Sequence, residues 1–259
     1  MSEILKVTLI QSNLVWENAV QNRINFERKI NAIIEKTDLI VLPEMFTTGF
    51  SMYPENVSET MQDDTVNWLK KIAKENNVAI CGSLVIEENG NYYNRFLFVT
   101  PDGQIKEYNK RHLFTLAGEH HKYKAGEHNV MITYKGWKIK PLICYDLRFP
   151  VWSRNINNYD VLLYVANWPK QRIEAWDSLL KARSIENMCY TIGVNRVGID
   201  PNNNEYSGST SMYDFLGRKQ TDIPLSKESS VTLELVKKDQ DVIRKKLNFL
   251  SDRDSFSIE

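Results

Sequence analysis

Cysteine is scarce in this chain of 259 residues, which contains Cys81, Cys144 and Cys189. An odd number of cysteines, two of them in apolar segments, argues against the disulfide framework of a secreted protein. Residues 1–6 lack the basic and then apolar pattern of a signal peptide, and no apolar run approaches the length of a membrane span. We therefore expect a cytoplasmic protein that has no membrane partner.

An excess of charge of either sign is also missing, because 33 basic residues balance 33 acidic ones. This balance argues against nucleic acid or an anionic membrane as a partner. The histidines lack metal-ligand spacing, both among themselves and relative to the cysteines; they are His112, His120, His121 and His128. We expect neither a metal nor a cofactor.

The order of apolar segments predicts an α/β fold. The chain is 42% hydrophobic and no linker, repeat or low-complexity segment divides it, so one domain over 1–259 is expected. Apolar runs predict strands over 4–10, 38–43, 78–86, 92–100, 104–108, 130–134, 137–144, 161–166, 190–197 and 231–236. Helical spacing predicts helices over 17–36, 65–75 and 172–187, and short ones near 151 and 240. Helix–strand alternation interrupted by hairpins indicates a four-layer α-β-β-α sandwich of two stacked mixed sheets.

Three expected strands end in side chains that suit hydrolysis. Glu44 follows the strand that ends at Pro43, Lys110 follows the strand that ends near Tyr108, and Cys144 ends a third strand. Taken singly, each has an ordinary explanation as an exposed strand end, a solvated lysine or a small buried thiol. Together, a carboxylate, an ammonium and a thiol are the parts of a hydrolase that uses a thiolate nucleophile.

The chemistry of these groups gives each a role. A thiol must lose its proton to attack, and its ordinary pKa is near ~8.5, so Glu44 is expected to act as its base. Lys110 would favour the thiolate and, with the backbone N–H of Tyr145, would stabilise the oxyanion formed on the substrate. Asp146 is expected to cap the short helix after the nucleophile. Arg148 is expected to be a buried structural cation paired with a carboxylate.

Three segments resemble the signatures of the nitrilase, or carbon–nitrogen hydrolase, superfamily, and they occur in its order. They are 42–46 (LPEMF), 108–114 (YNKRHLF) and 143–150 (ICYDLRFP). The resemblance extends over nearly the whole chain and implies a catalytic Glu-Lys-Cys triad at Glu44, Lys110 and Cys144. It also implies the four-layer sandwich and a homodimer, with the C-terminal tail, about 237–259, expected at the interface.

Many members of the superfamily carry a second glutamate in the loop after the lysine. Glu119 occupies the matching position, within a long irregular stretch of this sequence. The resemblance therefore gives Glu119 a positioning role toward Lys110 or the hydrolytic water. Glu127, which is near in sequence, is expected to be a surface carboxylate.

Further segments resemble the bacterial omega-amidase branch of the superfamily. They are 165–169 (VANWP), Arg172, 175–176 (AW), 179–187 (LLKARSIEN) and 193–198 (GVNRVG). Enzymes of that branch hydrolyse the terminal amide of an α-keto acid amide, such as 2-oxoglutaramate or 2-oxosuccinamate, to the dicarboxylate and ammonia. The resemblance thus implies a small-molecule amide as partner and a thioester on the cysteine.

Such a substrate ends in a carboxylate, which needs a donor in its pocket. Arg172 is the first candidate, because its planar guanidinium suits a carboxylate, although a solvated surface arginine is nearly as good an interpretation. Trp168 is expected to form an apolar wall or to lie in the core, and Asn167 precedes it in the same loop.

Other interpretations remain open at this point. The same scaffold also carries aliphatic amidases, nitrilases and N-carbamoyl hydrolases. A binding protein without catalysis is disfavoured because all three triad residues are present. A thiol redox protein is disfavoured because the sequence has no Cys-x-x-Cys pair.

Overall fold

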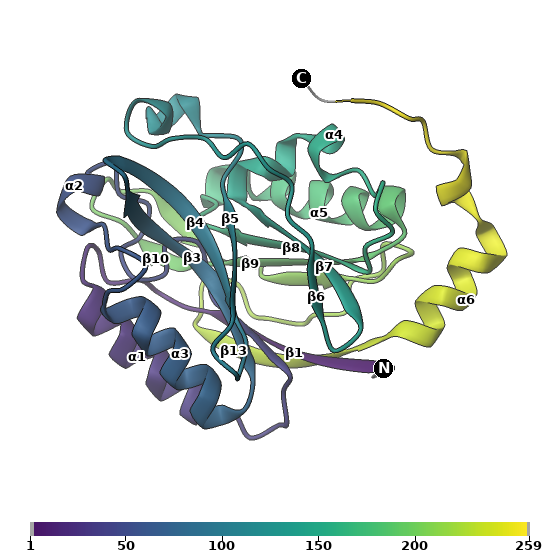
Figure 1. Ribbon diagram of the computed structural model, residues 1–259, viewed down its shortest axis with the longest axis horizontal. Coiled ribbons are helices and arrows are strands. Elements are labelled where there is room, and N and C mark those ends of the chain that lie inside the picture. The colour runs from purple at the N-terminus through teal and green to yellow at the C-terminus, as the bar shows by residue number, and fades with distance from the viewer. Residues whose placement is uncertain (1–2, 258–259) are drawn as a thin grey trace.

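Two mixed β-sheets organise this computed structural model, which describes residues 3–257 (Figure 1). The first sheet has six strands in the order β13-β1-β2-β3-β4-β5. These strands are β1 (Ile4–Gln11), β2 (Leu39–Val41), β3 (Ala79–Glu88), β4 (Asn91–Val99), β5 (Ile105–Asn109) and β13 (Ser229–Val236). Strand β2 pairs in parallel with β1 and β3, and the remaining pairs are antiparallel.

The second sheet has five strands in the order β12-β9-β8-β7-β6. They are β6 (Ile132–Tyr134), β7 (Trp137–Ile143), β8 (Val161–Ala166), β9 (Tyr190–Asn195) and β12 (Ser211–Tyr213). Strand β8 pairs in parallel with β7 and β9. A separate two-stranded sheet pairs β10 (Val197–Ile199) with β11 (Glu205–Ser207).

Helices α1 (Ala19–Asn31) and α3 (Asp64–Asn76) cover the outer face of the first sheet, and α5 (Ile173–Asn187) covers that of the second (Figure 1). The other helices are α2 (Pro54–Val57), α4 (Pro150–Ser153) and α6 (Lys237–Leu247). Phe26 of α1 and Leu69 of α3 belong to the apolar cluster on the first sheet, and Trp176 of α5 packs on the second. The expected four-layer α-β-β-α sandwich is confirmed.

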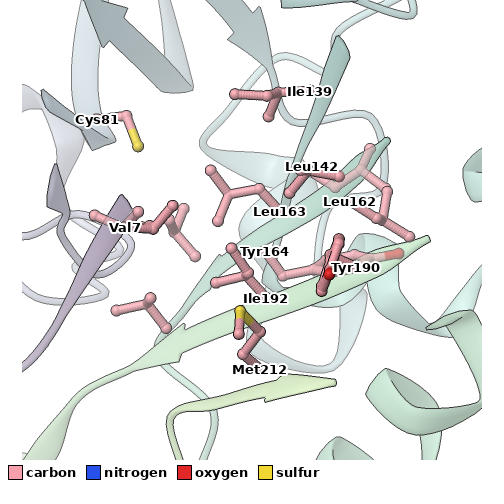
Figure 2. Close-up of a cluster of buried hydrophobic side chains, with 14 of the residues drawn as sticks. Val7, Cys81, Ile139, Leu142, Leu162, Leu163, Tyr164, Tyr190, Ile192 and Met212 are labelled. Carbon is pink, nitrogen blue, oxygen red and sulfur yellow. The ribbon is translucent and has the colours of Figure 1, made fainter. Parts of the chain in front are cut away.

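The space between the sheets holds the larger core. Leu39 of β2 belongs to this core, whereas the next residue, Ile40, belongs to the cluster under the helices, because successive side chains of a strand point to opposite faces. Both faces of β2 are therefore covered, which explains its unbroken apolar sequence. Figure 2 shows Val7 and Cys81 of the first sheet across this core from Leu163 of the second.

Most elements form where the sequence predicts them, with differences at element ends. The helix expected over 17–36 is α1 (Ala19–Asn31), which ends earlier than expected. It begins only after Asn18, because the side-chain oxygen of Asn18 caps its first turn. The strand expected over 190–197 ends at Asn195, whose side-chain oxygen accepts the backbone N–H of Trp168 at 2.8 Å. The chain then leaves the second sheet and forms the small β10–β11 pair.

The C-terminal helix α6 lies at the edge of the molecule (Figure 1) and is fastened there by polar contacts. Arg244 donates to the carbonyl of Tyr159 at 2.6 Å, and Gln240 donates to the carbonyl of Asp160 at 2.9 Å. Of the tail predicted over 237–259, the last two residues lie outside the described range, as do residues 1 and 2 of the predicted domain. Within residues 3–257 no helix combines the length and apolarity needed to span a membrane.

Candidate active site

The ends of three strands bring Glu44, Lys110 and Cys144 into one cluster. Glu44 lies three residues beyond β2, Lys110 directly follows β5, and Cys144 directly follows β7. Lys110 Nζ is 3.0 Å from Glu44 Oε1, and both side chains are fully buried. Glu44 and Lys110 both lie near enough to the Cys144 thiol to affect its pKa. All three predicted triad residues therefore meet at one place.

Glu44 uses both oxygens of its carboxylate. Oε1 accepts Nδ2 of Asn94 at 2.7 Å in addition to Lys110, and Oε2 accepts the backbone N–H of Asn167 at 2.7 Å. The side-chain amide of Asn167 also donates to the Glu44 carbonyl at 2.7 Å. Asn167 lines the pocket, and its donors hold Glu44 in place.

Glu119 also contacts the lysine. It lies in the short 3₁₀ helix η2 (Glu119–His121), and its two oxygens are 3.0 and 2.9 Å from Lys110 Nζ. Its Oε2 further accepts the backbone N–H of Phe114 at 2.5 Å. Lys110 is thus shared by two fully buried carboxylates. Glu127, in contrast, is exposed, as expected for a surface residue.

The nucleophile position lies in a sharp turn. Cys144 has a φ of +43°, in the left-handed region that residues other than glycine rarely adopt. Asp146 holds this turn, since its Oδ2 accepts the N–H of Ile143 at 3.0 Å and the hydroxyl of Tyr108 at 2.8 Å. Its Oδ1 accepts the N–H of His112 at 3.0 Å. The predicted capping role of Asp146 is confirmed, and the same carboxylate ties the turn to β5.

Burial has the largest effect on the pKa values of Cys144 and Lys110. It raises the pKa of the Cys144 thiol well above its ordinary value; the charges of Glu44 and Glu119 add to this effect, and that of Lys110 opposes it. Burial by itself would lower the pKa of Lys110, but the carboxylates of Glu119 and Glu44 outweigh it and raise that pKa. In the free protein these shifts favour the neutral thiol of Cys144 and the protonated form of Lys110.

A pocket of about 220 Å³ leads to the Cys144 side chain. Drug-sized ligands occupy pockets of roughly 300–1,000 Å³, so this one suits a smaller molecule. Phe50, Phe114 and Trp168 provide apolar walls, and Tyr145 also lines the pocket. Trp168 is 3% exposed, so it serves both as a wall and as part of the core.

Two arginines, Arg148 and Arg172, line the same pocket. Their guanidinium groups lie 5.1 Å from the ring centroids of Trp168 and Phe114, respectively. Neither has a carboxylate within ion-pair distance among residues 3–257, and no aspartate or glutamate of that range lines the pocket. The expectation for Arg148 is wrong: it is exposed at the end of the 3₁₀ helix η3 (Cys144–Arg148) and faces the pocket.

Sequence reasoning missed three contributors to the site. Asn94 lies in the middle of β4 and donates to Glu44, and Phe50 stacks 5.1 Å from Lys110 Nζ. Tyr206 of β11 forms part of the pocket wall, although it is distant from every motif. A polar residue within an apolar strand was the one signal available for Asn94. In the described residues, no group of three or more His, Cys, Asp or Glu side chains is arranged to hold a metal ion.

Comparison with known proteins identifies the family. The family model for carbon–nitrogen hydrolase matches residues 6–241. The chain belongs to the carbon–nitrogen hydrolase family. The resemblance seen in the three sequence motifs is thereby confirmed.

Several relatives within this family are similar over most of their length. Omega-amidase YafV of Escherichia coli is 50% identical over 206 residues, which cover 80% of each chain. The protein of the same name from Yersinia enterocolitica is 43% identical and covers 97% of this chain and 98% of its own. A 2-oxoglutaramate amidase of Bacillus subtilis is 40% identical over 74% of this chain and 77% of its own.

A solved structure shares the fold of this carbon–nitrogen hydrolase throughout. It is a CN-hydrolase superfamily protein from Xanthomonas campestris, described with an arsenic adduct in its active site. It has a TM-score of 0.97, is 38% identical, and the match covers 100% of both chains.

The protonation of the site predicts how the nucleophile reacts in the free enzyme. Because the pKa of Cys144 is raised, alkylation by iodoacetamide should accelerate about tenfold per pH unit between pH 7 and 9, as the thiolate fraction grows. Mass spectrometry of the peptide that contains Cys144 measures this rate. The fully buried Cys81 and Cys189 are internal controls that should stay unlabelled in the folded protein. A rate independent of pH over this range would mean a preformed thiolate and contradict the prediction.

Proposed function

We propose that this carbon–nitrogen hydrolase is an omega-amidase, which converts an α-keto acid amide such as 2-oxoglutaramate or 2-oxosuccinamate to the dicarboxylate and ammonia. One observation carries the proposal: a small pocket contains both Cys144, which lies beside Glu44 and Lys110, and two arginines that have no carboxylate partner among residues 3–257. The relatives named omega-amidase and 2-oxoglutaramate amidase, at 40–50% identity, support the same activity.

The first half of the reaction forms a thioester. Cys144 Sγ bonds to the amide carbonyl carbon while its proton passes to Glu44, the carboxylate near the thiol. Negative charge develops on the carbonyl oxygen, where Lys110 and the backbone N–H of Tyr145 stabilise it. Glu44 then gives the proton to the amide nitrogen, the C–N bond breaks, and ammonia leaves. A neutral thiol requires such a base near it.

The second half of the reaction releases the acid. Water adds to the thioester carbonyl as Glu44 takes one of its protons, and the C–S bond breaks. The proton returns from Glu44 to the Cys144 sulfur, and the new carboxylic acid ionises and departs. Glu119 holds Lys110 by two contacts of 2.9 and 3.0 Å throughout both halves, so its role is to position the lysine.

The charge of the pocket favours an α-keto acid over an α-amino acid. Arg172 is our candidate for the substrate carboxylate, with Arg148 as a second cation nearby and Trp168 and Asn167 beside them. An α-ammonium group would need an acidic partner, and no aspartate or glutamate of the described residues lines the pocket. Glutamine should therefore be a poor substrate, because its ammonium would lie near guanidinium groups unpaired.

Replacement of the nucleophile tests the activity. Cys144→Ala should lower the rate of ammonia release from 2-oxoglutaramate by more than about 1,000-fold while the protein stays folded, because no acyl acceptor remains. Cys189→Ala, at a buried cysteine outside the pocket, is the matched control and should keep its activity. Glutamine, a nitrile, an aliphatic amide and N-carbamoyl-β-alanine complete the panel for the wild-type enzyme. A strong preference for one of these would replace the omega-amidase assignment, and hydrolysis of none would indicate a binding protein.

Removal of one arginine tests the carboxylate subsite. Arg172→Met should raise KM for 2-oxoglutaramate by about 10–100-fold, the loss expected for a charge-assisted hydrogen bond. The same variant should leave hydrolysis of an uncharged amide such as propionamide nearly unchanged. Lys170→Met, two residues away and paired with Glu205 at 2.7 Å, is the control. An equal effect on both amides would exclude Arg172 as the carboxylate donor.

We also propose that the enzyme is a cytoplasmic homodimer, with α6 and the tail after it at the interface. Exposed apolar side chains on this side of the chain support the proposal, among them Val242 at 56% and Phe249 at 58% exposure. The three free cysteines are consistent with a reducing compartment. Sedimentation analysis should give twice the mass of 30.2 kDa, and Phe249→Asp should shift it toward one chain. A monomeric wild-type protein at micromolar concentration would refute the dimer.

A further inference from the structure

One asparagine, Asn94 of β4, contacts both buried carboxylates of the site with its side chain and the backbone of Lys110 with its own backbone. Its Nδ2 lies 2.7 Å from Oε1 of Glu44 and 3.4 Å from Oε1 of Glu119. Its backbone carbonyl accepts the N–H of Lys110 at 3.0 Å. Asn94 itself is fully buried, and it does not line the pocket. It therefore acts on the ionic groups and leaves the substrate untouched.

The charge balance of the cluster explains why this contact matters. Glu44 and Glu119 share a single ammonium, that of Lys110, so one negative charge remains when both carboxylates are ionised. A charge in a buried site is costly unless hydrogen bonds compensate for the lost water. Asn94 provides a donor to both carboxylates without adding charge of its own.

The orientation of the amide follows from the same electrostatics. In the reverse orientation, Oδ1 of Asn94 would face oxygens of Glu44 and Glu119, so the NH₂ group must point toward them. Oδ1 is left without a hydrogen-bond partner within residues 3–257. An unpaired buried oxygen lowers stability, so the needs of folding alone do not account for an asparagine at this position.

We propose that Asn94 is a positioning residue that keeps Glu44 ionised and directed at Cys144, and that it thereby sets the lowest pH at which the enzyme turns over. The inference rests on the proposed function, in which Glu44 accepts the thiol proton. Loss of the Asn94 donor leaves Lys110 and Asn167 as the donors to the Glu44 carboxylate among the described residues.

Four titratable groups face the Glu44 carboxylate from the surrounding elements. Lys110 follows β5, Glu119 belongs to η2, Tyr123 follows η2, and Cys144 begins η3. Only Lys110 is cationic among them, and it is shared with Glu119. The neutral amide donor is therefore one of few groups that favour the ionised base.

The test compares pH profiles of kcat/KM for the wild type, Asn94→Leu and Asn94→Asp. Leucine removes both donor contacts, whereas aspartate keeps the shape and replaces the donor with a third carboxyl group. The acid limb should move to higher pH by about one to two units in Asn94→Leu, because a carboxylate that loses a charged hydrogen bond binds a proton more readily. In Asn94→Asp the acid limb should move further. In Asn94→Leu, kcat/KM at pH 7 should fall about 10–100-fold, and it should recover in part at pH values above the shifted limb.

A matched control separates this role from a structural one. Asn155 is also fully buried, but it donates to the carbonyls of Tyr159 and Asn187, outside the pocket. Asn155→Leu should lower Tm and leave the acid limb where it is. If the Asn94 variants lose activity at every pH while their acid limbs stay at the wild-type position, the proposal is wrong. If Asn94→Leu does not fold, the position of the acid limb in the isosteric variant Asn94→Asp is sufficient to test the proposal.

A further variant distinguishes failure of this inference from failure of the proposed function. Glu44→Gln should be inactive on whichever amide of the panel the wild type hydrolyses, and that amide serves for all variants. Inactive Glu44→Gln with unshifted Asn94 profiles would reject the inference alone. Retained turnover in Glu44→Gln would reject Glu44 as the base, and with it both the mechanism and the inference.

Discussion

The rest of the site depends on the ion pairs that the buried ammonium of Lys110 makes with two glutamates. This ammonium lies 3.0 Å from Glu44 and 2.9 Å from Glu119, and none of the three side chains reaches solvent. Without it, two carboxylates would face each other at low dielectric, where like charges repel strongly. Neutral donors complete the arrangement, above all the amide of Asn94 and the backbone N–H of Phe114. The fold must therefore position one cation and several uncharged hydrogen-bond donors around the two carboxylates.

The two-sheet architecture explains how these side chains come together. Glu44 and Lys110 follow strands of the first sheet, whereas Cys144 and Asn167 follow strands of the second. The distance between Glu44 and Cys144 is thus set by the packing of the core between the sheets. Asp146 adds a direct link, because it bonds both the strained cysteine turn and Tyr108 of β5. Changes in that core should reach catalysis through the alignment of these strand ends.

The pocket and the pKa of the Cys144 thiol both affect which molecules can react at this site. Burial raises the pKa of the Cys144 thiol, and a smaller thiolate fraction limits unwanted reactions of the free thiol. Two arginines at the pocket have no acidic partner in the described part of the chain, so an anionic substrate would complete their charge balance. The cationic pocket beside the Cys144 thiol therefore favours a small amide that carries a carboxylate.

The sequence by itself determined the layer order and the strand ends that carry Glu44, Lys110 and Cys144, because apolar periodicity and short motifs are local properties of the chain. It also indicated Glu119, through resemblance to a family. Only the tertiary structure revealed Asn94, Phe50 and Tyr206, since no motif surrounds them and their importance comes from neighbours distant in sequence. The tertiary structure also placed Arg148 at the pocket, where the sequence had predicted a buried ion pair. It further indicated that burial raises the pKa of the Cys144 thiol, because burial and charge depend on packing.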